Sequence, residues 1–362
     1  MTSPNPFERI AATRGEQAPK PRPRTLHVVP DEPATVESAA IRPVRLADII
    51  GQPRVTSRLR SHVSSAILRD RVAGHVLIDG PSGYGKTTLA RAVVGELNAQ
   101  GRPSRLHTVM PSALTDVRSV ARELAQLAPN DVLFLDEIHS YPRRVQECLF
   151  SAMEDGTLTM PSEDGAQTVM LPAFTLLAAT TEPGKVLAPL RNRFALTAHL
   201  EPYSPDDLAL LLLAHAETAG IKLDVDAAEA IARASRYTPR KAIEHLAAVQ
   251  TYSDEVTGDA GAVLDAECAR QGLEYAGVDP FGLDDRDRRV LRTLVEDFHG
   301  GPVGRLPLAA HLGMSEAELS RDVEPYLMAA GLIVLRGRGR CATRATYLVL
   351  GLPVSPLLNG WR

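Results

Sequence analysis

The segment GPSGYGKT, residues 80–87, constrains the fold of this chain more than any other stretch. It fits the phosphate-binding pattern G-x-x-x-x-G-K-[ST] and stands between an apolar strand pattern, HVLID, and an amphipathic helix pattern, TTLARAVVGEL. Backbone N–H groups in such a turn point at phosphate oxygens, and the helix that begins there adds the positive end of its dipole. Lys86 would bind the β- and γ-phosphates, and Thr87 would offer a hydroxyl to Mg²⁺. The chain is therefore predicted to bind a nucleoside triphosphate in a turn built on three glycines, Gly80, Gly83 and Gly85.

A second segment, DVLFLDEIH at residues 131–139, predicts the catalytic acids. Its apolar residues form a buried strand that delivers Asp136 and Glu137 at its carboxyl end, where parallel α/β sheets bind ligands. Asp136 would hold Mg²⁺, and Glu137 would orient and deprotonate the attacking water. An apolar run that ends in Asp-Glu is commonplace by itself. In a chain with an intact phosphate loop, the pair predicts hydrolysis of the nucleotide.

The composition excludes several other classes of protein. With 44% hydrophobic and 23% charged residues the chain is globular, and its length suggests roughly two to three domains. The net charge of −4 argues against coating of nucleic acid by the whole surface, so any DNA contact must come from a local basic patch. Cys148, Cys268 and Cys341 form no zinc or disulfide pattern. MTSPNPFERI lacks the apolar segment of a signal peptide, and the leucine-rich run at 208–216 is too short to span a membrane, so we expect a soluble, cytoplasmic protein.

Changes in pattern along the chain predict three folded domains and two flanking segments. Alternating apolar strands and helices predict an α/β domain whose parallel sheet is covered on both faces. An all-helical stretch and then a helix-turn-helix with a ribbon follow it. The predicted boundaries are a disordered Pro-rich arm at 1–40, a nucleotide-binding domain at 41–202, a small all-α lid domain at 203–278, a winged-helix domain at 279–351 and a tail at 352–362.

Three local patterns give more specific expectations. TLTM and TVML, between Glu154 and Leu171, predict a hairpin that turns through PSEDGAQ. LPLAAHLG and SEAELSRDVEPYLMAAG predict a helix-turn-helix, and LIVLRGRGRCATRATYLVL predicts a two-strand ribbon. Guanidinium groups on the tip of such a ribbon suit phosphate contacts without base reading, although a solvated surface hairpin is the alternative interpretation. The tip carries Arg336, Arg338, Arg340 and Arg344.

Segments spread over residues 41–350 resemble the RuvB family of AAA+ ATPases, the motors of Holliday-junction branch migration. The matching segments include IRPVRLADIIGQ, HVLIDGPSGYGKTTLA, DVLFLDEIH, LPAFTLLAATT, YTPRKAI and GLDDRDRRVLRTL. Many ATPases share the phosphate loop and the Asp-Glu pair, whereas SAMEDG, LRNRF, GGPVG and EPYL narrow the resemblance to this family. The resemblance implies a P-loop AAA+ domain, ATP and Mg²⁺ as cofactors, and a homo-oligomeric ring, expected to be a hexamer.

The resemblance also implies roles for residues around the nucleotide. Ile41 and Arg42, together with Tyr203 of the lid, would contact the adenine. Thr181, at the end of AFTLLAATT, would sense the γ-phosphate. Further positions implied at the nucleotide are Thr88, Glu154, Asp155 and Gly156.

Two arginines are implied to couple hydrolysis to movement. Arg193 in PLRNRF resembles an arginine finger that enters the neighbouring subunit's site and contributes roughly 10³–10⁵ in rate. Arg240, directly after Thr238-Pro239, resembles a second sensor that ties the angle of the lid to the phosphate state. A single chain should therefore be nearly inactive, which implies a ring.

The sequence departs from the family pattern at two surfaces that bind other molecules. One DNA-contacting arginine of the family aligns with Leu335 and another with Glu316, whereas Arg340 matches a further contact. The hairpin is shorter than the family's, and its turn is acidic and polar, although the family presents apolar residues there to a RuvA-type junction-binding partner. Binding of a RuvA-type partner is therefore left open.

The leading hypothesis is an ATP-driven, ring-forming motor that translocates branched or duplex DNA without sequence specificity and migrates Holliday junctions in recombination and repair. One alternative is a AAA+ remodeller of a protein or DNA–protein complex that docks through its winged helix. Another is an ATP-gated DNA-binding regulator. The intact Glu137 argues against the regulator, because a pure switch needs no carboxylate that activates water.

Overall fold

A computed structural model of the chain describes residues 45–162, 165–337 and 339–354. The chain divides into two units, Met1–Ala39 and Ala40–Arg362, and every described residue belongs to the second. The predicted arm, the adenine contacts Ile41 and Arg42, the ribbon residue Arg338 and most of the predicted tail lie outside the described residues.

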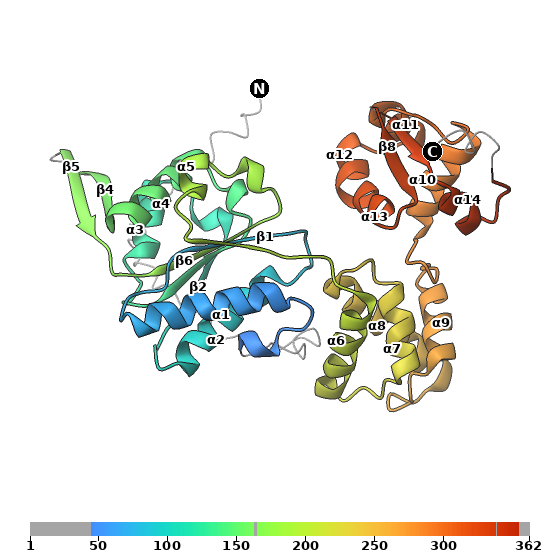
Figure 1. The fold of residues 1–362 in the computed structure, drawn as a ribbon, viewed down its shortest axis with the longest axis horizontal. Coiled ribbons are helices and arrows are strands. Elements are labelled where there is room, and N and C mark those ends of the chain that lie inside the picture. Colours follow the sequence, from blue (N-terminus) through green and yellow to red (C-terminus); the bar gives the residue numbers. More distant parts are fainter. Residues whose placement is uncertain (1–44, 163–164, 338, 355–362) are drawn as a thin grey trace, which may run out of the picture. The chain divides into compact units, whose positions relative to one another are not determined.

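A five-stranded parallel sheet lies at the centre of the first part of this unit (Figure 1). Its strand order is β2-β3-β6-β1-β7, and every neighbouring pair is parallel. Because the carboxyl ends of parallel strands meet at one edge, the segments that follow β1, β3 and β6 are brought together there. The strands are β1 (Val76–Asp79), β2 (Leu106–Val109), β3 (Val132–Leu135), β6 (Thr175–Thr180) and β7 (Leu196–His199).

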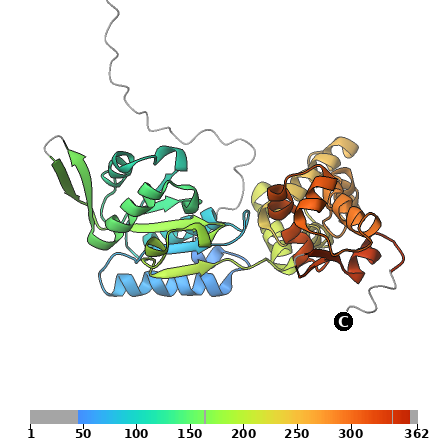
Figure 2. The ribbon, with the colours of Figure 1, turned by 90° about the horizontal axis from the view of Figure 1, so that it is seen from above.

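Helices cover both faces of the sheet, as the apolar strands predicted (Figures 1 and 2). Successive strand residues point to opposite faces. Ile78 and Phe134 pack in one core with α1 and α2, whereas their neighbours Leu77 and Leu133 pack in a second core with α3 and α4. The helices are α1 (Pro53–Leu68), α2 (Lys86–Ala99), α3 (Val117–Leu124), α4 (Arg143–Asp155) and α5 (Ala188–Arg191), with short 3₁₀ turns at Leu46–Asp48, Pro111–Ala113, Ile138–Ser140 and Pro183–Lys185.

The predicted hairpin is present, but its strands are longer than expected. β4 (Thr157–Ser162) and β5 (Gly165–Met170) pair antiparallel from Thr157–Met170 to Ser162–Gly165. The expected long turn through PSEDGAQ is therefore wrong, because most of that segment continues the backbone ladder. The exposed hydroxyls of Thr159 and Thr168 lie 3.2 Å apart across the pair.

The next part is all-helical, as expected. The helices α6 and α7, which share a core with α8 and α9, begin after acceptor side chains typical of helix starts. Ser204 Oγ, for example, accepts a hydrogen bond from the N–H of Asp207 at 3.0 Å. The bounds are α6 (Pro205–Ala219), α7 (Val225–Arg233), α8 (Pro239–Thr257) and α9 (Ala266–Tyr275).

The last part contains the predicted helix-turn-helix and ribbon, with two differences. The second helix is broken by a π-turn before α13, because Pro325 lacks the N–H that a continuous helix requires. The second ribbon strand ends at Ala342, and a helix follows where strand was expected, with the N–H of Thr343 bonded to Thr346 Oγ1 at 3.3 Å. The elements are α10 (Asp285–Glu296), α11 (Arg305–Leu312), α12 (Glu316–Glu318), the π-turn (Leu319–Val323), α13 (Glu324–Ala329), β8 (Ile333–Arg336), β9 (Gly339–Ala342) and α14 (Arg344–Val349).

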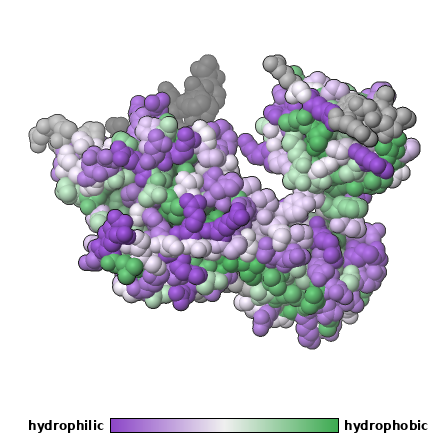
Figure 3. Space-filling model, in the orientation of Figure 1, coloured by the Kyte–Doolittle hydropathy of each residue, from purple (hydrophilic) through white to green (hydrophobic). Residues whose placement is uncertain are grey.

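Figure 3 shows hydrophilic and hydrophobic residues interspersed on the visible face of the molecule. Among the described residues, no helix combines the length and the apolar character needed to cross a membrane.

Candidate nucleotide-binding site

The phosphate loop connects β1 to the N-terminus of α2, as predicted. Gly85 precedes the first residue of α2 and adopts a left-handed conformation, with φ of 89°. Gly83 also has a positive φ, 81°, and a Cβ there would lie only 2.8 Å from Thr238 Cγ2. Glycine is therefore required at this point both for the backbone angle and for the close approach of the lid segment.

Lys86 extends its side chain back over this loop. Its buried ammonium group donates to the carbonyl oxygens of Gly80 and Pro81 at 2.9 and 3.2 Å. It also lies 3.7 Å from Glu137 Oε1. Burial lowers the pKa of Lys86, and the carboxylates of Glu137 and Asp136 oppose that shift. The loop and the acidic pair thus form one site.

Asp136 and Glu137 follow β3 directly, and Glu137 has an unusual set of partners. Its backbone is left-handed, with φ of 48°, and its N–H donates to Asp136 Oδ1 at 3.0 Å. Glu137 Oε2 accepts from both the N–H and the hydroxyl of Thr181, at 3.0 and 2.9 Å. The predicted sensor Thr181 therefore contacts the predicted catalytic acid.

His139, which the sequence indicated as a supporting histidine beside the Asp-Glu pair, contacts the predicted acid. Its Nδ1 lies 2.9 Å from Thr180 Oγ1 and 3.2 Å from Glu137 Oε2. The ring is 15% exposed, and its other nitrogen lies 3.4 Å from Glu182 Oε1.

The residues predicted to hold Mg²⁺ supply the hard oxygen ligands that this ion prefers. Thr87 offers a hydroxyl at the start of α2, and Asp136 offers a carboxylate at the end of β3. Across the described ranges, no cluster of three or more His, Cys, Asp or Glu residues could hold a metal.

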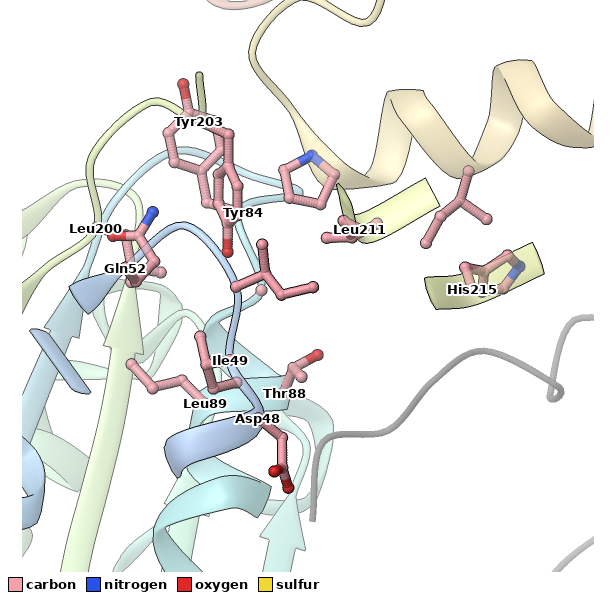
Figure 4. A pocket seen from close by; sticks show the side chains of 14 residues that line it. Asp48, Ile49, Gln52, Tyr84, Thr88, Leu89, Leu200, Tyr203, Leu211 and His215 are labelled. Atoms are coloured by element: carbon pink, nitrogen blue, oxygen red, sulfur yellow. The ribbon is translucent and has the colours of Figure 1, made fainter. Parts of the chain in front are cut away.

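An apolar pocket opens beside the phosphate loop (Figure 4). The predicted residue Tyr203 lines it, and its ring meets that of Tyr84 edge-to-face at 6.3 Å between centroids. Burial raises the pKa of Tyr203 to about 12, so the hydroxyl stays neutral. Sequence reasoning identified Gly85, Thr88 and Tyr203 of the lining. It missed most of the other residues, because most of them come from segments far apart in the chain: Ile49, Gln52, Tyr84, Leu200, Leu211 and His215.

Arg240, the predicted second sensor, reaches the phosphate loop. Its guanidinium donates to Ser82 Oγ at 3.2 Å, and its backbone N–H donates to the carbonyl of Gly83 at 3.4 Å. The start of α8 is therefore bonded directly to the loop that would surround the phosphates.

Arg193 and Glu154 lie together, and neither lines the described pocket. Arg193 forms an ion pair with Glu154 at 2.5 Å and lies over the ring of Phe150, 5.2 Å from its centroid. Both charged side chains are more than a third exposed. Asp155 ends α4, and Gly156 follows it in a left-handed conformation. The structure thus groups the SAMEDG segment with Arg193.

The ribbon arginines differ from the expected exposed cluster. Arg336 is exposed at the end of β8, whereas Arg340 is buried and pairs with Glu324 through two hydrogen bonds, of 2.6 and 3.0 Å. Arg305 lies 3.6 Å from the same carboxylate. The expectation that Arg340 lies on an exposed tip needs correction, because its guanidinium is held inside the domain by a buried acid.

Two family models match the chain. One is described as the Holliday junction DNA helicase RuvB P-loop domain and matches residues 41–200. The other is described as the RuvB C-terminal winged helix domain and matches residues 280–351.

Relatives match over most of the chain. The Holliday junction branch migration complex subunit RuvB of Fervidobacterium nodosum is 38% identical over 333 residues, which cover 91% of this chain and 94% of the relative. The protein of the same name from Rhodococcus erythropolis is 40% identical over 322 residues, covering 88% and 86%. The solved structure of the Thermotoga maritima RuvB Holliday junction branch migration motor superposes with a TM-score of 0.74 at 35% identity, covering 87% of this chain and 99% of that one.

Proposed function

Because the chain belongs to the RuvB family, we propose that it is an ATP-driven motor that assembles into a ring, a hexamer in our proposal, and translocates DNA to migrate Holliday junctions. The relatives named as subunits of a Holliday junction branch migration complex support this proposal. The observation that carries it is the position of Arg193. Its half-exposed guanidinium pairs with Glu154, outside the lining of the pocket, which suits a trigger that serves the site of a neighbouring subunit.

Within one site, each residue has a separate task. The N–H groups of the phosphate loop and Lys86 bind the phosphates, and Glu137 takes a proton from the attacking water. Thr87 and Asp136 would hold Mg²⁺, which would supply positive charge against the negative charge that develops on the phosphates. Arg240, already bonded to the loop, would detect the γ-phosphate.

Three domains would carry this activity, at 41–202, 203–278 and 279–351. Separate buried cores support this division: two flank the sheet, one lies among α6–α9 and one lies in the C-terminal part. The three free cysteines, Cys148, Cys268 and Cys341, fit a reducing compartment, and we place the motor in the cytoplasm.

A mixing experiment tests the shared site. Lys86→Ala removes the phosphate-binding charge but keeps Arg193, whereas Arg193→Ala keeps the phosphate loop but removes the trigger. Each variant alone should lose its DNA-stimulated ATPase, by roughly 10³-fold or more for Arg193→Ala. Mixed in equal amounts, the two should recover measurable turnover, because some interfaces join an intact loop to an intact Arg193.

The matched control is Arg144→Ala, another exposed arginine of the same part of the chain. It should leave turnover near the wild-type rate. Two findings would contradict the proposal: an ATPase that DNA does not stimulate, or an Arg193→Ala variant with normal turnover.

A further inference from the structure

Five residues of the lid, Arg236–Arg240, connect two distant parts of the molecule, and we call them the sensor segment. At one end, Arg240 is bonded to Ser82 and Gly83 of the phosphate loop. Near its middle, the carbonyl of Tyr237 accepts from the N–H of Tyr203, which lines the pocket, at 3.1 Å. The segment is therefore in contact with the phosphate loop and with a residue that lines the pocket.

At its other end, the guanidinium of Arg236 is held by the C-terminal part of the chain. Nε donates to the carbonyl of Gly282 at 2.8 Å, and one terminal nitrogen lies 2.8 Å from Asp284 Oδ2 and 2.6 Å from Asp287 Oδ2. Asp284 and Asp287 flank the start of α10, the first helix of the winged-helix part. Only 12% of the Arg236 side chain is exposed.

A residue of the EPYL motif completes this site. The Arg236 guanidinium lies over the ring of Tyr326, 5.0 Å from its centroid, and the Tyr326 hydroxyl donates to the carbonyl of Phe281. Arg236 is thus enclosed by three oxygen acceptors and an aromatic face. A planar guanidinium fits such a set, whereas an ammonium group does not.

The buried charge of Asp287 makes its ion pair with Arg236 important for stability. Asp287 is fully buried, and burial raises the pKa of its carboxyl, an effect that Arg236 opposes. Removing one partner of a buried ion pair leaves an uncompensated charge. Arg236 is therefore tightly fixed to the start of α10.

The backbone between the two ends is also constrained. Arg236 and Tyr237 both have positive φ angles, 52° and 57°, which are rare in side-chain-bearing residues. Such conformations persist where the surroundings determine them. The sensor segment therefore has little freedom to absorb a displacement of Arg240.

We propose that Arg236 is a positioning residue that transmits the nucleotide state, detected at Arg240, to the winged-helix part, so that the affinity for DNA depends on the bound nucleotide. This inference rests on the proposed DNA motor. It adds a physical connection, because one short segment is bonded to the phosphate loop and to the first helix of the DNA-binding module.

The test compares DNA affinity in two nucleotide states for the full chain. A fluorescent four-way junction is titrated with protein saturated either with ADP or with a non-hydrolysable ATP analogue. For the wild-type chain we expect the two dissociation constants to differ by about tenfold, a size common for coupling between sites. Arg236→Gln should bring the ratio of the two dissociation constants close to unity, while the ATPase rate without DNA stays near wild type. Arg236→Lys keeps the positive charge and should give a ratio between those of Arg236→Gln and the wild type.

Two further variants complete the test, one on the opposite side of the contact and one as a control. Asp287→Asn removes the charge from the opposite side of the contact and decides the matter if Arg236→Gln does not fold. Arg233→Gln, at an exposed arginine paired with Glu229 on α7, is the matched control and should keep the wild-type ratio.

The outcomes are distinct. Folded Arg236→Gln or Asp287→Asn protein that keeps the wild-type ratio would overturn the role of Arg236, and so would a wild-type ratio of unity. A wild-type chain that binds no DNA in either state would overturn the proposed function itself, and this inference with it.

Discussion

At the scale of single residues, the two oxygens of Glu137 are not equivalent. Oε2 accepts two hydrogen bonds from Thr181 and lies beside His139, whereas Oε1 lies on the side of Lys86. The hydrogen bonds to Oε2 therefore fix the orientation of the carboxylate. In the proposed mechanism, Oε1 would be the oxygen that accepts a proton from the attacking water.

Glu137→Gln should keep nucleotide binding but lower the turnover rate by about 10²-fold or more, because an amide cannot act as the base. Thr181→Val should lower turnover less, since it removes one of the two Thr181 donors that orient the acid. Steady-state ATPase rates and binding of a fluorescent nucleotide measure both effects. Glu147→Gln, at an exposed acid of α4, serves as the control; normal turnover in Glu137→Gln would show that another group activates the water.

His75 predicts a pH dependence of stability. Burial lowers its pKa to about 4, and its neutral Nδ1 accepts from the N–H of Leu176 at 2.9 Å. Because the ordinary pKa is 6.5, the unfolded chain binds more protons in the window from 6.5 to 4, so stability present above pH 6.5 is lost as the pH falls through that window. The loss from this residue should be about 2 kcal/mol between pH 7 and pH 5.

Urea denaturation at a series of pH values measures this loss. His75→Asn keeps an acceptor for the N–H of Leu176 but cannot take up a proton, so it should flatten the pH dependence. An unchanged slope in this variant would mean that other groups cause it; His245, whose pKa burial also lowers to about 4, is the first to test next.

At the scale of elements, two of the motifs that narrowed the family turn out to build the ribbon. Val303 of GGPVG exchanges backbone hydrogen bonds with Arg340, at 3.0 and 2.7 Å, and Glu324 of EPYL binds the guanidinium of the same residue. A Cβ on Gly301 would lie 2.2 Å from the Arg340 carbonyl oxygen, so glycine is required there. Arg340 thus joins three segments of the winged helix.

Substitution of the two ribbon arginines, Arg340 and Arg336, should therefore have different effects. Arg340→Ala should destabilise the winged-helix part by about 3–5 kcal/mol, because it leaves Glu324 buried without this partner. Arg336→Ala should leave stability nearly unchanged but reduce the slope of log affinity against log salt by about 0.9, as expected for one lost phosphate contact. Thermal melting and DNA titrations over a range of salt concentrations distinguish them; a stable Arg340→Ala protein with a reduced salt slope would place this arginine on DNA after all.

At the scale of the whole molecule, three arginines form contacts in different parts of the proposed motor. Arg240 bonds the lid to the phosphate loop, Arg236 bonds the same segment of the lid to α10, and Arg193 pairs with Glu154 away from the pocket. In the proposed ring, a neighbouring nucleotide would compete with Glu154 for Arg193. Each hydrolysis event would then change contacts at a subunit boundary and, through the sensor segment, at the DNA-binding module.

The sequence by itself was enough to predict the central residues of the nucleotide site and the order of helices and strands in the α/β domain. The phosphate loop, Asp136 and Glu137 could be identified because their chemistry depends on local spacing: a turn between a strand and a helix, and two acids at the end of a buried strand. Likewise, apolar runs alternating with helix patterns predicted a sheet covered on both faces.

Only the tertiary structure decided which distant residues meet. The pocket lining around Tyr84, the burial of Arg340 by Glu324 and the enclosure of Arg236 by Asp287 and Tyr326 all join segments that no periodicity relates. The local sequence around an arginine does not show whether its side chain faces solvent or pairs with a buried acid. The difference lies in the desolvation and pairing of charge, which depend on packing across the fold and not on neighbours in the chain.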